Sequence, residues 1–94
     1  MTIRNSDTET LERSKTDLQT TRLYEIVLFN DDVNTFDWVI TSLVEVCDHT
    51  LEQAEQCSIL VHYKGKCTVK SGEYSQLKPK CTELLNRGLS AEIC

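Results

Sequence analysis

Alternation of apolar and polar positions predicts a strand early in the chain. Residues 23–29 are rich in β-branched and aromatic side chains, and Tyr24, Ile26 and Leu28 fall on one face of an extended segment. A polar cluster follows at once, formed by Asn30, Asp31 and Asp32. We therefore expect the strand to end near residue 29 in a polar turn.

Two segments with helical spacing of apolar residues come next. The first covers about residues 35–47 and carries its apolar stripe on Phe36, Val39, Ile40, Leu43, Val44 and Cys47. Asn34 stands three residues before Asp37 and resembles a capping box at the start of this helix. Thr50 and Gln53 form a second capping pair, and Gly65 is expected to terminate the helix that they open.

The remainder of the chain predicts a strand, a helix and a closing strand. Apolar and polar residues alternate over residues 66–70, which we predict to form the strand. Helical spacing then returns, and we place a regular helix at about 76–87 with Pro79 in its first turn, where a missing amide donor costs least. Apolar and polar residues alternate again over residues 89–93, which predicts the closing strand. The order β-α-α-β-α-β predicts an α+β sandwich of three helices against a small three-stranded, largely antiparallel sheet.

The chain divides into an extension and one domain. Residues 1–22 mix small polar groups with both charge signs and offer few apolar side chains, so burial cannot offset the entropy lost on ordering them. We predict a flexible N-terminal extension there and a single folded domain at 23–94. The length of 94 residues leaves room for only one core.

Charge and hydropathy exclude several classes of function. The 10 basic residues against 15 acidic ones give a net charge of -5, whereas nucleic-acid binders present a basic face, so DNA and RNA are not expected partners. No apolar run approaches the roughly 20 residues that cross a bilayer. The first residues lack a secretory signal, so we expect a monomer in the reducing cytoplasm, away from any membrane.

The five cysteines are expected to be buried thiols. They stand singly, and no two have the C-x-x-C spacing that a zinc knuckle or a redox motif needs. Free cysteine is among the most buried residue types. The alternative is a metal site, which would require the fold to gather four residues: Cys47, His49, Cys57 and His62.

The polar turn and His62 are the candidate binding groups. If the first two helices pack antiparallel, the end of the second helix brings His62 near the start of the first. An amide oxygen of Asn30, a carboxylate of Asp31 and a ring nitrogen of His62 together could hold a primary ammonium, which has three hydrogen-bond donors. The alternative is structural: the turn caps the helix, and His62 interacts with the carbonyl end of its own helix.

An enzyme is a further hypothesis. Asp31, Asp32 and His62 could form a hydrolytic or metal site. The sequence contains no nucleophile motif, no glycine-rich phosphate loop and no H-E-x-x-H. We therefore expect no enzymatic activity, no cofactor and no metal.

The same residues carry a resemblance to a known family. The segment YEIVLFNDD at 24–32, followed by VHYKGK at 61–66, resembles the ClpS adaptor family, and the likeness covers about residues 23–93. The resemblance implies a small adaptor that binds N-degrons, which are destabilising N-terminal residues such as Leu, Phe, Tyr or Trp. It also implies delivery of the bound protein to a Clp-family ATPase that feeds a compartmental peptidase.

The resemblance assigns roles to individual positions. The ammonium-binding groups of the family fall on Asn30, Asp31 and His62. Its hydrophobic pocket falls on a second set: Asn34, Phe36, Val39, Ser58 and Val61. Phe36 and Ser58 both replace a Met that is common in relatives, and the pair Asn34-Thr35 replaces a common Thr-Pro. These departures alter the shape of the pocket and leave the preferred N-terminal residue open.

Delivery involves a second surface and the extension. In relatives, a face around the third helix contacts the N-terminal domain of the ATPase, and Glu73 and Lys78 match it when a short gap is allowed. The flexible extension of relatives enters the ATPase pore. A competing hypothesis is a docking module that binds a chaperone or translation factor through helix surfaces, like the C-terminal domain of the ribosomal stalk protein. That domain lacks the N-D-D and histidine constellation.

Overall fold

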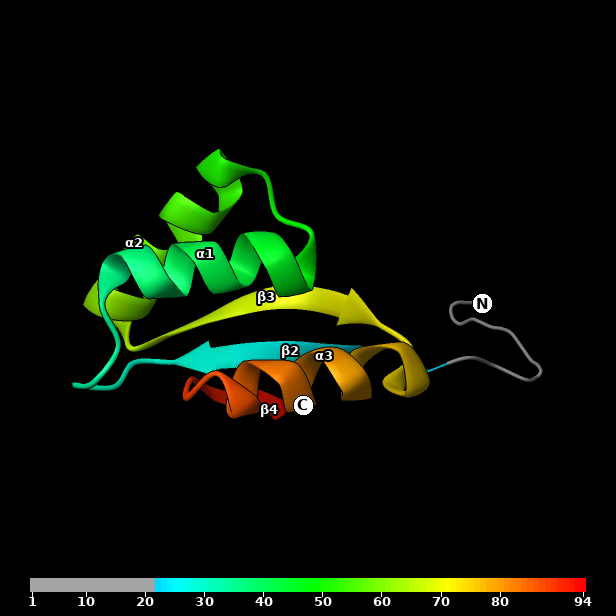
Figure 1. Ribbon diagram of the computed structural model, residues 1–94. Coiled ribbons are helices and arrows are strands. Elements are labelled where there is room, and N and C mark those ends of the chain that lie inside the picture. The colour runs from blue at the N-terminus through cyan, green and yellow to red at the C-terminus, as the bar shows by residue number, and fades with distance from the viewer. Residues whose placement is uncertain (1–21) are drawn as a thin grey trace, which may run out of the picture.

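The computed structural model describes residues 22–94; the predicted extension lies outside this range apart from Arg22. The elements are strand β2 (Tyr24–Phe29), helix α1 (Phe36–Cys47), helix α2 (Leu51–Lys64), strand β3 (Lys66–Gly72), helix α3 (Tyr74–Asn86) and strand β4 (Ser90–Ile93) (Figure 1). The predicted order β-α-α-β-α-β is confirmed. Within the described residues, no helix has the length and apolar character needed to cross a membrane.

The described strands form one antiparallel sheet, as predicted, and their order in it is β3-β2-β4. The central strand β2 ends with Phe29 opposite Lys66 of β3 and Ser90 of β4. The register of β2 against β3 shifts between Ile26 and Val27, which marks a β-bulge. This register places the start of β3 and the start of β4 on either side of the point where β2 ends.

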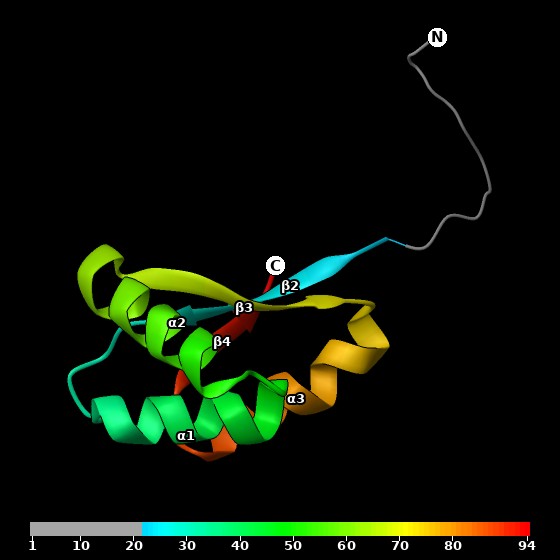
Figure 2. The same ribbon diagram turned by 90° about the horizontal axis from the view of Figure 1, so that it is seen from above.

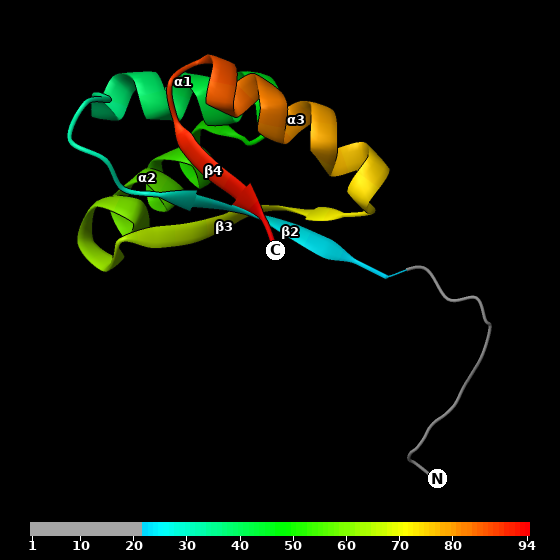
Figure 3. The ribbon, with the colours of Figure 1, turned by 90° about the horizontal axis from the view of Figure 1, so that it is seen from below.

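The three helices of residues 22–94 lie on one face of the sheet (Figures 2 and 3). Ile26 and Leu28 of β2 point into the core and are 0% and 1% exposed. The helices bury their own apolar residues against this face, including Leu43, Ala54 and Leu84. On the other face of the sheet the polar side chains of Glu25, Thr68 and Glu92 are exposed. The period-two pattern of β2 therefore fixes which face the helices cover.

The capping signals of the first two helices are only partly confirmed. The Thr50 and Gln53 capping box is present at the start of α2, and Gly65 ends that helix with φ 92, a conformation that favours glycine. The capping role predicted for Asn34 is wrong. Thr35 is the cap of α1, and its side-chain oxygen accepts a hydrogen bond from the Trp38 amide at 3.1 Å.

Helix α3 begins two residues earlier than predicted. Its first residue is Tyr74, so Pro79 lies in the second turn and not in the first. The amides of Gln76 and Leu77 both donate to the Glu73 carbonyl, which fixes the start. Leu77 is 1% exposed and packs in the core with Cys81 one turn further on. Burial of these side chains therefore keeps the helix regular across the missing donor of Pro79.

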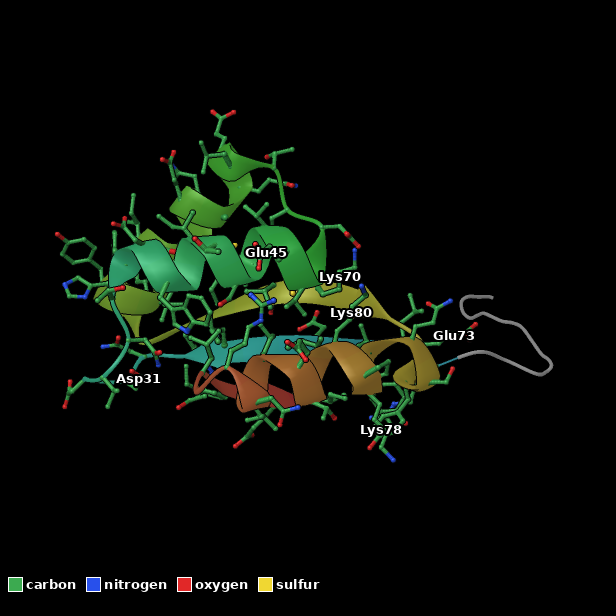
Figure 4. The ribbon with its side chains drawn as sticks, viewed as in Figure 1. Asp31, Glu45, Lys70, Glu73, Lys78 and Lys80 are labelled. Atoms are coloured by element: carbon green, nitrogen blue, oxygen red, sulfur yellow. The ribbon has the colours of Figure 1, made fainter. Side chains whose placement is uncertain are left out.

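Lysines from other elements neutralise the C-terminal end of α1. The last turn of α1 contains no basic residue. Lys80 of α3 donates to the carbonyl of Val46 at 3.0 Å, and Lys70 of β3 donates to the carbonyl of Cys47 at 3.3 Å. Figure 4 shows both lysines at this end of the helix. Cations at the negative end of a helix dipole stabilise it, so these contacts also join α1 to the sheet and to α3.

All five cysteines are thiols in the structure, and their burial varies. Cys47 and Cys81 are buried, as predicted. Cys57 and Cys67 are half-buried, and Cys94 is exposed, so the expectation of uniform burial is wrong. Burial in the core raises the pKa of both Cys47 and Cys81.

The thiol of Cys57 is expected to react slowly with alkylating reagents. Burial, together with a hydrogen bond to the Cys67 thiol, raises the pKa of Cys57 to about 12. Only the thiolate attacks iodoacetamide, so Cys57 should label much more slowly at pH 8 than the exposed Cys94. Peptide mass spectrometry over a labelling time course measures both rates. Equal rates at the two positions would contradict this expectation.

Candidate functional site

Three element ends meet at one edge of the molecule. These are the end of β2, the start of α1 and the end of α2, on the left in Figures 1 and 2. The amide of Asn30, just after β2, donates to the carbonyl of Gly65, just after α2, at 3.0 Å. This hydrogen bond fixes the turn after β2 against the last turn of α2, and it places Asn30 close to the helix end that carries His62.

A pocket of about 350 Å³ opens between these elements. Its lining residues are Leu28, Phe29, Asn30, Asp31, Asp32, Asn34, Phe36, Val39, Ser58, Val61, His62 and Leu89. The predicted ammonium-binding set and the predicted pocket set both fall within this lining. Segments that are about 30 residues apart in the chain therefore contribute to one cavity.

The pocket has an exposed polar mouth and a buried, mostly apolar base. Asn30 and His62 are exposed, and Asp31 is half-buried. Ser58 and Val61 of α2, by contrast, are 2% and 5% exposed. The ring of Phe36, the first residue of α1, contacts the His62 ring edge to face, with centroids 5.7 Å apart. The antiparallel approach of α1 and α2 that the sequence predicted is thus confirmed.

Asp31 is held in place as an anion. One of its carboxylate oxygens accepts hydrogen bonds from the amides of Val33 and Asn34, both at 2.9 Å, and the other accepts from the Asn34 side chain at 2.8 Å. Partial burial acts to raise the pKa of Asp31, but these hydrogen bonds outweigh it and lower the pKa below its usual value. A fixed negative charge therefore stands at the pocket wall at neutral pH.

Asn34 connects the turn to the opposite side of the pocket. Its side-chain nitrogen donates both to Asp31 and to the carbonyl of Gly88 at 2.9 Å. Beside it, the indole N–H of Trp38 donates to the carbonyl of Arg87 at 3.0 Å. These bonds join the start of α1 to the turn between α3 and β4. Asn34 lines the pocket as predicted. Its side-chain amide, however, positions Asp31 and adds no apolar surface to the base.

Four lining residues were not predicted as part of the pocket. Leu28 and Phe29 come from β2, and Leu89 precedes β4. Antiparallel pairing of Phe29 with Ser90 places Leu89 beside Asn30. The alternation of residues 89–93 would identify Leu89 only once this register is known. Asp32 was predicted as part of the polar turn and of a possible hydrolytic or metal site, and it adds a second carboxylate residue to this pocket.

The lowered pKa of Asp31 predicts an acid-dependent loss of stability. A carboxyl whose pKa is lower in the folded state stabilises the fold above its unfolded pKa, here near 3.8, and this contribution disappears as the pH falls through the lower folded value. Asp31→Asn cannot titrate. We therefore expect the difference in free energy of unfolding between wild type and Asp31→Asn to shrink below about pH 4.

Urea unfolding of both proteins at neutral pH and near pH 3 measures this difference. Other carboxylates titrate in both proteins, so their contribution cancels in the comparison. A difference that stays constant over this range would show that Asp31 has no lowered pKa in the folded protein.

The structure does not gather the alternative metal site. Cys47 ends α1, whereas His62 stacks beside Phe36 at the opposite end of that helix. His49 hydrogen-bonds to the carbonyl of Val69 at 2.6 Å through its Nε2 atom. Within residues 22–94, no three His, Cys, Asp or Glu side chains are grouped to hold a metal ion. The four residues of the alternative metal site are therefore not brought together.

The predicted ATPase-contact residues lie far from the pocket. Glu73 caps the start of α3 and Lys78 follows in that helix, and both are exposed. Figure 4 shows them at one end of the molecule and Asp31 at the other. A ligand in the pocket and a protein bound at this end of α3 would not compete for the same surface.

Comparison with known proteins shows both family and fold. Residues 19–92 match the family described as "ATP-dependent Clp protease adaptor protein ClpS". Adapter proteins ClpS from Campylobacter jejuni subsp. jejuni (strain 81-176) and subsp. doylei are each 34% identical, over 92% of this chain and 94% of theirs. The structure of Agrobacterium tumefaciens ClpS2 bound to L-phenylalaninamide is similar with a TM-score of 0.76 and 21% identity, covering 80% of this chain and 98% of that one.

Proposed function

The chain belongs to the ClpS family of ATP-dependent Clp protease adaptor proteins, and on this premise we propose that it binds proteins bearing a bulky hydrophobic N-terminal residue and delivers them for degradation. The observation that carries the proposal is one pocket with two kinds of wall. Hydrogen-bond acceptors surround its mouth, and mostly apolar side chains form its base. A chain terminus with a large apolar first residue has the complementary pattern.

The mouth of the pocket suits an ammonium group. We propose that Asn30, Asp31 and His62 accept its three hydrogen bonds, with Asn34 as a positioning residue for Asp31. An N-terminal amine has a pKa of about 7.7–8.0 and is mostly protonated at pH 7, so it would meet a carboxylate that is already ionised. Internal residues of a protein lack this group. The site would therefore distinguish a terminus from the same residue inside a chain.

The base of the pocket suits one side chain. Phe36, Val39 and Val61 offer apolar surface, and Leu28 and Leu89 extend it from the sheet. A volume of about 350 Å³ lies at the small end of the range for ligand pockets. The structural neighbour from Agrobacterium tumefaciens was solved with L-phenylalaninamide, which combines a free amine with one aromatic side chain. This ligand has the two features that the walls of the present pocket would recognise.

Delivery completes the proposal. A Clp-family AAA ATPase would receive the bound protein, and we propose that its N-terminal domain contacts Glu73 and Lys78 on α3. Residues 1–22 would act as an N-terminal extension that enters the ATPase pore. The protein would work as a cytoplasmic monomer. It would need neither catalysis nor a cofactor, because the pocket groups only hold and release a terminus.

Peptide binding tests the proposal. Fluorescence polarisation should detect binding of labelled peptides that begin with Phe, Leu, Tyr or Trp, and acetylation of the same peptides should abolish it, since the acetyl group removes the charge and two donors. Equal binding of free and acetylated peptides, or no binding of either, would refute the proposal. A docking module that acts through its helix surfaces would bind neither the free nor the acetylated peptides.

The exposed His62 separates an adaptor from an enzyme. His62→Ala removes one acceptor from the pocket mouth without opening the core. An adaptor should keep a weakened affinity for the free peptide and leave it chemically intact. Mass spectrometry of the peptide after prolonged incubation with wild type checks for turnover. If wild type yields a cleaved or modified peptide and His62→Ala yields none, the enzyme hypothesis would be supported.

A further inference from the structure

A buried serine at the base of the pocket has no hydrogen-bond partner. Ser58 of α2 lines the pocket and is 2% exposed, and its Oγ atom makes no hydrogen bond. A serine within a helix often bonds back to the carbonyl four residues earlier, here Ala54, but that bond is absent. Buried polar groups are almost always paired in native proteins. Because Ser58 also lines the pocket, its unpaired hydroxyl is available to a ligand that enters there.

The helix places this hydroxyl at a defined depth. Ser58 precedes His62 by four residues, so the two side chains lie on the same face of α2, about 6 Å apart along the helix axis. His62 stands at the exposed mouth, whereas Ser58 Oγ is inaccessible to solvent. A first residue whose amine binds at the mouth would direct the far end of its side chain toward Ser58.

We propose that Ser58 makes this pocket prefer an N-terminal tyrosine over phenylalanine. The two side chains differ only in the phenol hydroxyl at the end of the ring. The phenol O–H can donate to Ser58 Oγ, which pairs both hydroxyls, whereas phenylalanine leaves Ser58 unpaired. No existing hydrogen bond holds the serine side chain, so it can rotate toward the phenol without losing one. This inference rests on the proposed function and specifies its ligand.

A second buried serine provides a matched control. Ser42 of α1 is 0% exposed and its Oγ atom also lacks a partner, but it does not line the pocket. Replacing either serine with alanine removes the same atoms from the same kind of helix interior. Only the change at Ser58 should alter the choice between the two peptides.

The test is a competition assay with two peptides that are identical apart from Tyr or Phe at the first position. Wild type and Ser42→Ala should bind the tyrosine peptide about 3- to 10-fold more tightly, the ratio expected for one hydrogen bond. In Ser58→Ala the ratio should fall to one or below, because the phenol then enters an apolar base. Circular dichroism melting curves confirm that all three proteins are folded.

Two results would overturn the role of Ser58 while the proposed function stands. They are equal affinity of wild type for the two peptides, and a tyrosine preference that survives in Ser58→Ala. A different result would reject the proposed function itself: wild type that binds neither free peptide better than its acetylated form. The acetylated pair therefore belongs in the same experiment.

Discussion

Replacing Asp31 with asparagine should weaken binding of a peptide with a free hydrophobic N-terminus by about 10- to 150-fold. This range corresponds to the loss of one charge-assisted hydrogen bond of about 1.5–3 kcal/mol. Asparagine keeps an oxygen that can accept from the amides of Val33 and Asn34, and it loses only the acceptor of the Asn34 side chain. The lost quantity is mainly the negative charge that faces the ammonium. Fluorescence polarisation at pH 7 measures both affinities.

Asp37→Asn is the control for this charge change. Asp37 is exposed in the first turn of α1 and does not line the pocket. Its replacement removes the same charge near the same helix end and should leave peptide affinity within about a factor of two to three, the effect of a screened surface charge. If the two variants weakened binding equally, general electrostatic attraction would explain the effect and Asp31 would have no specific role.

The largest expected effect on stability comes from Leu84→Ala. Leu84 of α3 is 0% exposed and packs in the main core. Truncation of a fully buried leucine leaves a cavity and costs about 2–5 kcal/mol. A domain of this size is typically stable by about 0.05–0.15 kcal/mol per residue, so the variant should lose a large share of its total stability. Urea unfolding followed by circular dichroism gives the change.

The neighbouring Leu85 provides a matched comparison, since the same substitution can be made there at an exposed position. Leu85 is 51% exposed. Leu85→Ala should change the free energy of unfolding by about 0.5 kcal/mol or less. Similar losses for the two variants would mean that α3 does not pack on the sheet with the face described above.

Most of the fold follows from periodicity and capping signals. The helix pattern of residues 35–47 and the alternation of β2 place their apolar residues in the core, and the capping pair at Thr50 fixes the start of α2. The start of α3 could not be predicted, because Pro79 argues locally for a later start, whereas the Glu73 carbonyl accepts from the Gln76 and Leu77 amides and opens the helix earlier. Tertiary packing decides such conflicts, and the sequence pattern alone does not weigh them.

The parts of the site that lie within a sequence motif could be predicted. The parts that depend on the register between strands could not. Asn30 and His62 were joined by assuming that α1 and α2 pack antiparallel, which the contact of Phe36 with His62 confirms. Leu89 enters the pocket only through the pairing of β4 with β2. The bond from Asn34 to Gly88 depends on the same register. Long-range hydrogen bonds of this kind leave no local pattern in the sequence.

Amide NMR spectra of the full chain, titrated with a phenylalanine-first peptide and with its acetylated form, test the central claim most directly. The claim is that the terminus binds where the ends of β2, α1 and α2 meet. The free peptide should shift the signals of residues 30–36 and 58–65 and leave those of Glu73 and Lys78 in place, and the acetylated peptide should shift none of them. Shifts centred on α3, or the same shifts with both peptides, would contradict it.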